Sequence, residues 1–232
     1  DMNTNVWTQL NPGNPAFAPG LSGIWAPAWV LDTATHRCYL TGGATSSSPG
    51  GGNLSTLYVY DTVANSWQSQ LPNFVSPRNH HAAFIFSRPT DLLKLLCVAG
   101  GVNASSVALS STQCYDFVTS SWHAENSDLG ALPEATWGMG YAQTPKVNGH
   151  NLWLVNGANA SFSLNNQTWV YNALTQKWTA IGPLESNYFY RTSAVTLNGT
   201  VYHIGGALGG FGYSGLSDRY IGLRTFLPLL LK

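Results

Sequence analysis

Leu40-Thr41-Gly42-Gly43 is followed, after a polar loop, by Leu57-Tyr58-Val59-Tyr60-Asp61 and then, after a short turn, by Trp67. The stretch is an apolar strand ending in two glycines, a loop, an apolar strand ending in Tyr-Asp, and a tryptophan. The same order returns three more times, the last time without its tryptophan, starting at Cys97-Val98-Ala99-Gly100-Gly101, Leu154-Val155-Asn156-Gly157 and Tyr202-His203-Ile204-Gly205-Gly206. An internal repeat of this kind fixes the architecture before any single residue is interpreted.

The spacing within the repeat is constant where it can be measured. Six positions separate the Asp or Asn from the Trp in the pairs Asp1/Trp7, Asp61/Trp67, Asp116/Trp122 and Asn172/Trp178. These tryptophans are 60, 55 and 56 residues apart, close to the period of roughly 50 residues of a kelch blade. From Asp1 to about Leu223 the chain therefore resembles the kelch family of β-propellers, and the resemblance implies fold more than function.

The strand pattern predicts an all-β, kelch-type β-propeller with four blades of four antiparallel strands. The predicted units are an outer strand at 1–10, blades at about 21–71, 78–126, 135–183 and 188–223, and an apolar C-terminal tail at 224–232. The last blade lacks its outer strand, and the N-terminus begins with one. We therefore expect the strand of Trp7 to pair with that of Tyr220 and close the ring, which removes exposed sheet edges. The alternative is that the chain lacks upstream repeats of a larger ring.

Charge is scarce in this chain of 232 residues. Asp, Glu, Lys and Arg make up 9% of it, against roughly 25% in typical soluble domains, and ten basic residues balance ten acidic ones. Such a surface offers no basic face to nucleic acid and opposes self-association only weakly. No apolar run approaches the ~20 residues of a membrane helix. The composition predicts an extracellular or cell-surface protein.

Three cysteines are present, at positions 38, 97 and 114. Cys97 and Cys114 fall on the second and third strands of one blade, which are antiparallel neighbours, so a disulfide between them is one interpretation. The other is that all three are buried thiols that pack as small apolar residues. Cys38 has no evident partner.

Catalytic motifs are missing from the sequence. It contains no HExxH, no GxSxG, no phosphate-binding loop and no paired carboxylates. His80 and His81 are adjacent on a strand and so point to opposite faces, which prevents them from binding one metal side by side. Galactose-oxidase-like copper enzymes use a kelch propeller, but no motif here places Cys, Tyr and His around one ion. We predict no cofactor, and a copper-dependent oxidase or glycan-active enzyme is the least favoured alternative.

The mouth of the central channel is the candidate ligand site. Aligning the first strands on Ala28, Ala82, Gly140 and Ala194 places one residue of each blade in an equivalent ring, namely Trp25, Asn79, Trp137 and Arg191. Flat aromatic faces with directed donors suit a sugar or a carboxylate. The alternative is that these side chains plug a narrow channel.

The loops after the glycine pairs carry no charge and, in kelch relatives, often contact partners; they span residues 44–55, 102–111, 158–167 and 207–216. Asn-X-Ser/Thr sequons make five asparagines candidate glycosylation sites, namely Asn53, Asn103, Asn159, Asn166 and Asn198.

The C-terminal tail crowds five apolar side chains into six residues, namely Phe226, Leu227, Leu229, Leu230 and Leu231. We expect this tail to dock on protein, either on its own blade or on a second subunit. The sequence as a whole predicts a secreted or cell-surface non-catalytic propeller that binds protein or glycan, or serves adhesion. The alternative is a structural subunit of an extracellular assembly or filament, which would self-associate through its low-charge faces or its tail.

Overall fold

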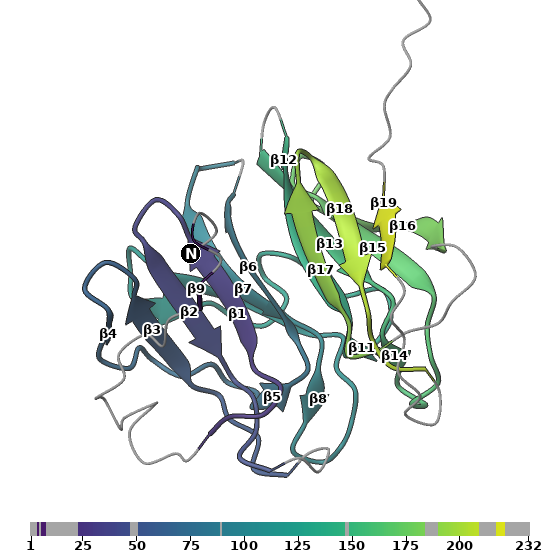
Figure 1. The fold of residues 1–232 in the computed structure, drawn as a ribbon, viewed down its shortest axis with the longest axis horizontal. Helices are drawn as coiled ribbons and strands as arrows, with labels where there is room; N and C mark the ends of the chain where they lie inside the picture. The colour runs from purple at the N-terminus through teal and green to yellow at the C-terminus, as the bar shows by residue number, and fades with distance from the viewer. Residues whose placement is uncertain are drawn as a thin grey trace, which may run out of the picture.

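The computed structural model describes residues 4, 6–7, 23–46, 51–88, 90–146, 149–183, 190–208 and 217–220. These residues form strands, turns and loops; they contain no helix, and hence none long and apolar enough to cross a membrane. Figure 1 shows the strands gathered into sheets whose first strands, β1, β6, β12 and β17, lie toward the middle of the molecule.

Four antiparallel sheets follow one another along the described chain, and we call them blades 1 to 4. Blade 1 consists of β1 (Ala28–Asp32), β2 (Arg37–Thr41), β3 (Leu57–Asp61) and β4 (Ser66–Trp67). Blade 2 consists of β6 (Ala82–Ser87), β7 (Lys94–Ala99), β9 (Thr112–Asp116) and β10 (Ser121–Trp122). Blade 3 consists of β12 (Gly140–Lys146), β13 (Gly149–Val155), β15 (Gln167–Asn172) and β16 (Lys177–Pro183). Blade 4 consists of β17 (Ser193–Leu197), β18 (Thr200–Ile204) and β19 (Ser217–Tyr220).

Two short ladders lie at one end of the inner strands. β5 (Arg78–Asn79) pairs with β8 (Val102–Asn103), and β11 (Thr136–Trp137) pairs with β14 (Ala158–Asn159). The predicted all-β architecture of four-stranded antiparallel sheets is confirmed. The inner strand of blade 1 begins at Ala28, after the predicted start of that blade at about 21, because the residues just before it belong to a turn at this end.

The Tyr-Asp signature makes the turn between the third and fourth strands of a blade. The Oδ1 atom of Asp61 accepts hydrogen bonds from the backbone N–H groups of Val63 (3.0 Å) and Ala64 (2.8 Å). Asp116 and Asn172 make the same two bonds in blades 2 and 3. This local turn folds the next strand back. The Trp ring then packs on the Tyr of the signature, at centroid distances of 5.2, 5.5 and 5.3 Å for Tyr60/Trp67, Tyr115/Trp122 and Tyr171/Trp178.

The glycine pair joins each blade to the next. Gly42 and Gly43 have φ of 52° and 93°, a region that costs other residues free energy, and the N–H of Gly43 donates to the carbonyl of Arg78 at 2.9 Å. In the following repeat, Gly101 (φ 96°) donates in the same way to the carbonyl of Thr136 at 2.8 Å. Each acceptor lies just before the inner strand of the next blade, so the repeat's most regular feature is also its inter-blade link.

The core includes three apolar interfaces between successive blades, and a further apolar cluster lies around β11 and β14, with Trp137, Ala158 and Tyr190 among its members. Along each strand alternate side chains point to the preceding and to the following blade. Tyr39 and Val59 of blade 1 pack on Leu96 of blade 2. The interface between blades 2 and 3 includes Phe84, Phe86, Leu152 and Leu154. The interface between blades 3 and 4 includes Trp153, Val155, Val170 and Val201.

Cys97 and Cys114 form a disulfide, with their sulfur atoms 2.05 Å apart. The two residues are direct partners in the antiparallel pairing of β7 and β9, and both are buried. Cys38 is a half-buried free thiol, and burial raises its pKa. The bond therefore cross-links two strands of blade 2 inside its interface with blade 3.

The predicted closure by Trp7 is not formed. Trp7 lies outside any strand and is 100% exposed, and blade 4 has three strands among the described residues. The expectation rested on the outer strand missing from the last blade and on the six-residue spacing from Asp1 to Trp7. That spacing is a local pattern, which does not specify a long-range partner. The predicted C-terminal tail, 224–232, lies outside the described residues.

Replacing both Cys97 and Cys114 by Ala should lower the free energy of unfolding by about 2–4 kcal/mol, because a constraint on the unfolded chain is lost. Urea unfolding measures this. In the unfolded but unreduced protein, alkylation should modify one cysteine, Cys38; three modified cysteines would contradict the assignment.

Replacing Gly101 by Ala should destabilise the protein more than replacing Gly130. Both residues have positive φ, 96° and 65°, so each Ala carries the left-handed backbone cost of about 1 kcal/mol. A Cβ at Gly101 would also lie 2.6 Å from the carbonyl oxygen of Asn79, whereas one at Gly130 meets nothing within 4 Å. Equal losses of unfolding free energy in urea would argue against the close inter-strand packing at Gly101.

Candidate functional site

Four left-handed residues form an arc at the end of the inner strands where β5, β8, β11 and β14 lie. Ala26, His80, Gly138 and Arg191 have φ of 49°, 51°, 65° and 54°. Their backbones are joined in order: His80 N–H donates to Ala26 C=O (3.0 Å), Gly138 N–H to His80 C=O (2.9 Å) and Arg191 N–H to Gly138 C=O (2.6 Å). Positive φ is uncommon outside glycine. Here it orients the backbone so that one residue of each blade hydrogen-bonds to the corresponding residue of the next blade.

The residue before each member of this arc also has the same place in its blade, because it pairs with the residue that follows the glycine corner. The pairs are Trp25 with Ala44, Asn79 with Val102, Trp137 with Ala158 and Tyr190 with Ala207. Tyr190, and not Arg191, is therefore equivalent to Trp25, Asn79 and Trp137. The sequence prediction placed the last blade one residue out of register.

Strand pairing explains this error. Ser193, and not Ala194, pairs with Ile204, the residue just before Gly205, in the way that Ala28 pairs with Thr41. The prediction matched small side chains instead. Counting partners outward from the Asn198-Gly199 turn would have given the observed register.

Five side chains, which we call the aromatic mouth, contact one another in a closed cycle: Trp25, His80, Trp137, Tyr190 and Arg191. Ring centroids are 4.4 Å apart for Trp25/His80, 5.4 Å for His80/Trp137 and 5.3 Å for Trp137/Tyr190. The Arg191 guanidinium lies 5.2 Å from the rings of both Tyr190 and Trp25, which is cation–π distance. The structure thus brings together three of the four predicted residues and adds His80 and Tyr190.

Asn79, the fourth predicted residue, has its side-chain amide bonded inside the protein. It is fully buried, and its Nδ2 donates to Asn53 Oδ1 at 2.8 Å. Asn53 Nδ2 in turn donates to the carbonyl of Val102 at 2.7 Å, which fixes the orientation of both amides. The Oδ1 of Asn79 therefore faces His80 Nδ1 at 2.8 Å, so Nδ1 carries the proton of the neutral imidazole.

Burial keeps both adjacent histidines uncharged. It lowers the pKa of His80 to about 3, with a further lowering by the charge of Arg191. His81 is fully buried, with its Nε2 at 2.8 Å from Thr41 Oγ1, and burial holds its pKa well below the usual value. The prediction that these two histidines lie on a strand is wrong: they stand between β5 and β6, because His80 turns the chain with a φ of 51°.

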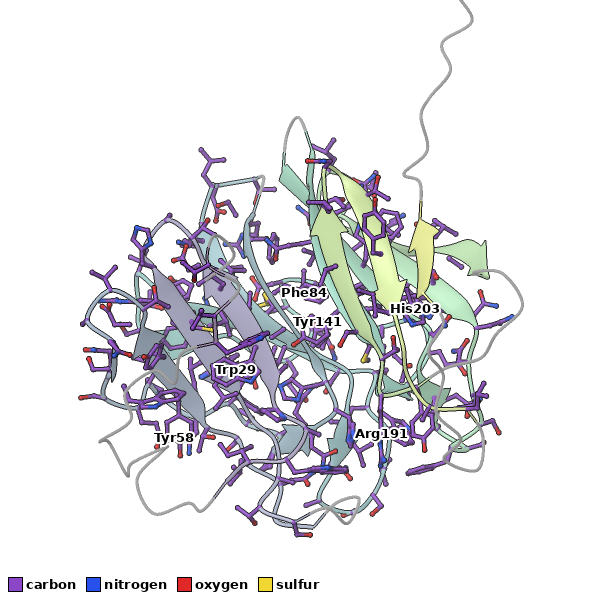
Figure 2. All side chains as sticks on the ribbon, in the orientation of Figure 1. Trp29, Tyr58, Phe84, Tyr141, Arg191 and His203 are labelled. Atoms are coloured by element: carbon purple, nitrogen blue, oxygen red, sulfur yellow. A yellow bond between two sulfur atoms is a disulfide. The ribbon has the colours of Figure 1, made fainter. Side chains whose placement is uncertain are left out.

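A cavity of about 640 Å³ lies between the inner strands of all four blades. Figure 2 shows Trp29, Phe84 and Tyr141 near the centre of the molecule, with Arg191 farther toward the end that holds β11 and β14. The lining residues come from β1, β6, β12 and β17 with the residue before it; those that matter below are Trp29, Phe84, Tyr141, Gln143, Ser193 and Thr196.

Two side chains of β12 cap the open edges of the inner strands. Tyr141 Oη accepts a hydrogen bond from Trp29 N–H (2.9 Å) and donates to Trp29 C=O (3.1 Å). The amide of Gln143 does the same for Ile85, accepting from its N–H at 3.3 Å and donating to its C=O at 2.9 Å. These caps satisfy backbone groups that an inner strand leaves unpaired. No sequence pattern signalled them, because each partner is more than fifty residues away.

The cavity is electrically neutral. None of its lining residues ionises near pH 7, and burial raises the pKa of Tyr141 to about 12. Among the described residues, no group of three or more His, Cys, Asp or Glu side chains is arranged to hold a metal ion. The site can therefore offer aromatic faces, hydroxyl groups and amides, but neither charge nor a general acid or base.

The candidate glycosylation sites differ in their surroundings. Both amide groups of Asn53 are used inside the protein, so a glycan there would break the network that orients His80. Asn103 and Asn159 instead use only Oδ1, which accepts backbone N–H groups two and four residues ahead in their loops. Asn198 lies in the hairpin turn before β18, and Asn166 directly precedes β15.

Comparison with known proteins addresses the fold. No family model matches the sequence, and no curated protein matches it. Among solved structures, the chain is similar to YjhT, a kelch-repeat β-propeller protein, with a TM-score of 0.61 and 14% identity over 89% of this chain and 68% of that chain. The fold is a kelch-type β-propeller. At this identity the likeness extends to the fold and not to a ligand.

The buried histidines should make stability fall in mild acid. Between pH 3 and 6.5 the unfolded chain binds a proton at His80 that the folded propeller does not, so the free energy of unfolding should decrease by about 1.4 kcal/mol per pH unit as pH falls. The substitution His80→Asn, which tolerates positive φ, should reduce this slope by about one proton in urea unfolding at pH 4.5–7.

His36→Asn is the matched control. His36 also has positive φ, 55°, but its ring is exposed. Its replacement should leave the slope unchanged; an equal reduction in both variants would show that burial at the mouth is not the cause.

Proposed function

We propose that this propeller is a non-catalytic binding module of the cell surface or the extracellular space, and that it binds a glycan in its central cavity. Protein partners are the second ligand class that such a module takes, through the uncharged loops around the mouth. The proposal depends on the composition of the cavity, not on the likeness to YjhT.

The neutral cavity is the observation that carries this proposal. The ring of Trp29 is 40% exposed and borders the cavity together with Phe84. The hydroxyl-bearing side chains Ser193 and Thr196 lie across from them on β17. Aromatic faces suit the C–H faces of a sugar, and hydroxyl groups suit its oxygens. A charged ligand would have no counter-charge there, so the site favours a neutral saccharide.

The titratable groups nearest the cavity support binding over catalysis. General acid–base chemistry needs a pKa close to the working pH. The pKa of Tyr141 is raised to about 12 and that of His80 is lowered to about 3, so neither exchanges a proton readily at pH 7. No observation favours a copper-dependent oxidase or a glycan-active enzyme.

The proposed location rests on two features. The buried Cys97–Cys114 disulfide suits an oxidising compartment, where such bonds persist. The second feature is the low share of charged residues in the chain, 9%. The alternative of a subunit in an extracellular assembly is favoured by one observation, the exposed apolar side chains of blade 4, among them Val195, Leu197 and Ile204.

Replacing Trp29 by Ala should weaken glycan binding about ten-fold, because stacking on an aromatic face contributes about 1.4 kcal/mol or less. Isothermal titration with a panel of neutral and acidic mono- and disaccharides measures this. Trp7→Ala is the matched control, since Trp7 is 100% exposed and does not line the cavity. The proposal fails if no neutral saccharide binds at millimolar concentration, or if both variants bind alike.

A further inference from the structure

A second cavity, of about 330 Å³, lies between blades 1 and 2 and shares no lining residue with the central cavity. This blade 1–2 pocket is lined by Tyr39 and Val59 of blade 1, by Tyr115 and Phe117 of blade 2, and by Arg37. The ring of Phe117 lies 5.4 Å from that of Tyr39 and 5.5 Å from that of Tyr115, measured between centroids. Its volume is at the lower end of the roughly 300–1,000 Å³ of ligand pockets.

The pocket exists because the loop that follows blade 1 is short. Eleven positions separate Trp67 from Arg78, whereas fourteen separate their equivalents in the next repeat, Trp122 and Thr136. The loop after blade 1 therefore has three residues fewer with which to fill the space between its blade and the next one.

Two of the additional residues after blade 2, Ser127 and Asp128, pack where blades 2 and 3 meet. In each loop one carbonyl accepts the indole N–H of the next blade's outer tryptophan: that of Pro72 after blade 1 and that of Leu129 after blade 2. The first lies five positions beyond its own blade's tryptophan and the second lies seven. The buried carboxylate of Asp128 accepts a hydrogen bond from Arg88 at 2.6 Å. Blade 1 has no counterpart of this packing.

One hydroxyl in the pocket lacks the hydrogen bond that its equivalent makes. Tyr171 of blade 3 donates from Oη to the carbonyl of Asp128 at 3.1 Å. Tyr115 has the same place in blade 2, is 2% exposed and lines the pocket, but its hydroxyl bonds to no residue in the part of the chain that the structure describes. A polar group on a buried side chain gains free energy from a partner. The Tyr115 hydroxyl is therefore available to a ligand.

The charge at the pocket is positive. Arg37 is exposed, and among the described residues no carboxylate forms an ion pair with it. Asp61, its partner across the strands, accepts backbone N–H groups of its own turn instead. Burial raises the pKa of Tyr39, and the adjacent guanidinium of Arg37 partly offsets this rise. Arg37 thus supplies one uncompensated charge beside three aromatic rings.

We propose that the blade 1–2 pocket binds an aromatic carboxylate. The ring of the ligand packs among Tyr39, Tyr115 and Phe117, its carboxylate pairs with Arg37, and the Tyr115 hydroxyl donates a hydrogen bond to one of its polar atoms. A free aromatic acid and a polypeptide that ends in an aromatic residue present the same chemistry. This site is independent of the proposed glycan site, because the two cavities have no lining residue in common.

Ligand-observed NMR titration of the 232-residue chain with phenylacetate tests the proposal. Two matched probes separate the parts of the ligand, since phenylacetamide keeps the ring without the charge and acetate keeps the charge without the ring. We expect a millimolar dissociation constant for phenylacetate, and binding weaker by at least about five-fold for each matched probe, because each lacks one contact.

A charge-removing variant assigns the carboxylate contact. Arg37→Met should weaken phenylacetate binding about five-fold and leave phenylacetamide binding unchanged, because an exposed ion pair contributes about 1 kcal/mol or less. Lys177→Met is the matched control, since Lys177 is an exposed cation of blade 3 that does not line this pocket.

Two equivalent tyrosines separate a ligand contact from a structural one. Tyr115→Phe should weaken phenylacetate binding about three-fold and leave the urea midpoint of unfolding unchanged. Tyr171→Phe should do the reverse, because it loses the hydrogen bond to Asp128 and lies outside the pocket. Both variants keep the aromatic ring, so the packing between blades is retained.

The tripeptide Gly-Gly-Phe distinguishes the two sources of the ligand. Tighter binding of its free acid than of phenylacetate, with loss of binding on amidation, assigns the pocket to the end of a polypeptide chain. Tighter binding of phenylacetate assigns it to a small molecule, and either result supports the site.

The proposal is wrong if phenylacetate does not bind at millimolar concentration, or if phenylacetamide binds as tightly as phenylacetate. Equal losses of phenylacetate binding in Arg37→Met and Lys177→Met would also overturn it, because they would show a general effect of net charge and not a contact in this pocket.

Discussion

The backbone hydrogen bonds between neighbouring blades are the constraint on which the rest of the structure depends. The five described above each involve a left-handed residue, either at the glycine corner or at the arc of Ala26, His80, Gly138 and Arg191. A non-glycine residue adopts this conformation at a cost, which the surrounding contacts must offset. These bonds set where each inner strand begins. The aromatic mouth lies just before the start of the inner strands, and the cavity lies along them. Backbone pairing, and not side-chain preference, therefore determines the geometry of both.

Strand alternation then makes every blade incomplete by itself. A blade has two apolar faces, one for each neighbour, and the three interfaces of this arc bury both faces of blades 2 and 3. Stability in such an array is approximately a sum of terms for units and for their nearest neighbours. Blades 1 and 4, at the ends of the described arc, each lack one of these nearest-neighbour terms. Their exposed residues, Val195 and Leu197 at one end and Trp29 and Leu31 at the other, are therefore direct consequences of the same pattern that forms the core.

The parts of the fold that could be predicted from sequence are those set by short-range chemistry. The Asp61 turn and the packing of Trp67 on Tyr60 lie within seven residues, so the repeat reveals them wherever it occurs. The site was only partly predictable. Trp25, Trp137 and Arg191 were found, but the one-residue error in blade 4 hid Tyr190, and His80 was considered only as a metal ligand and rejected. The caps by Tyr141 and Gln143 join residues 112 and 58 positions apart, and no local pattern encodes such contacts.

Those caps also make the sides of the cavity different from one another. The edges of β1 and β6 are satisfied by Tyr141 and Gln143, whereas no hydroxyl or amide from another blade caps β17 in the described part of the chain. On the β17 side, the Thr196 hydroxyl donates to the carbonyl of Gln143 at 2.8 Å, and Ser193 lines the cavity opposite the strand of Trp29. A ligand that contacts both Ser193 and Trp29 must span the cavity between β17 and β1. How far the cavity excludes water would set the affinity of the proposed saccharide, because desolvation of a polar contact strengthens it.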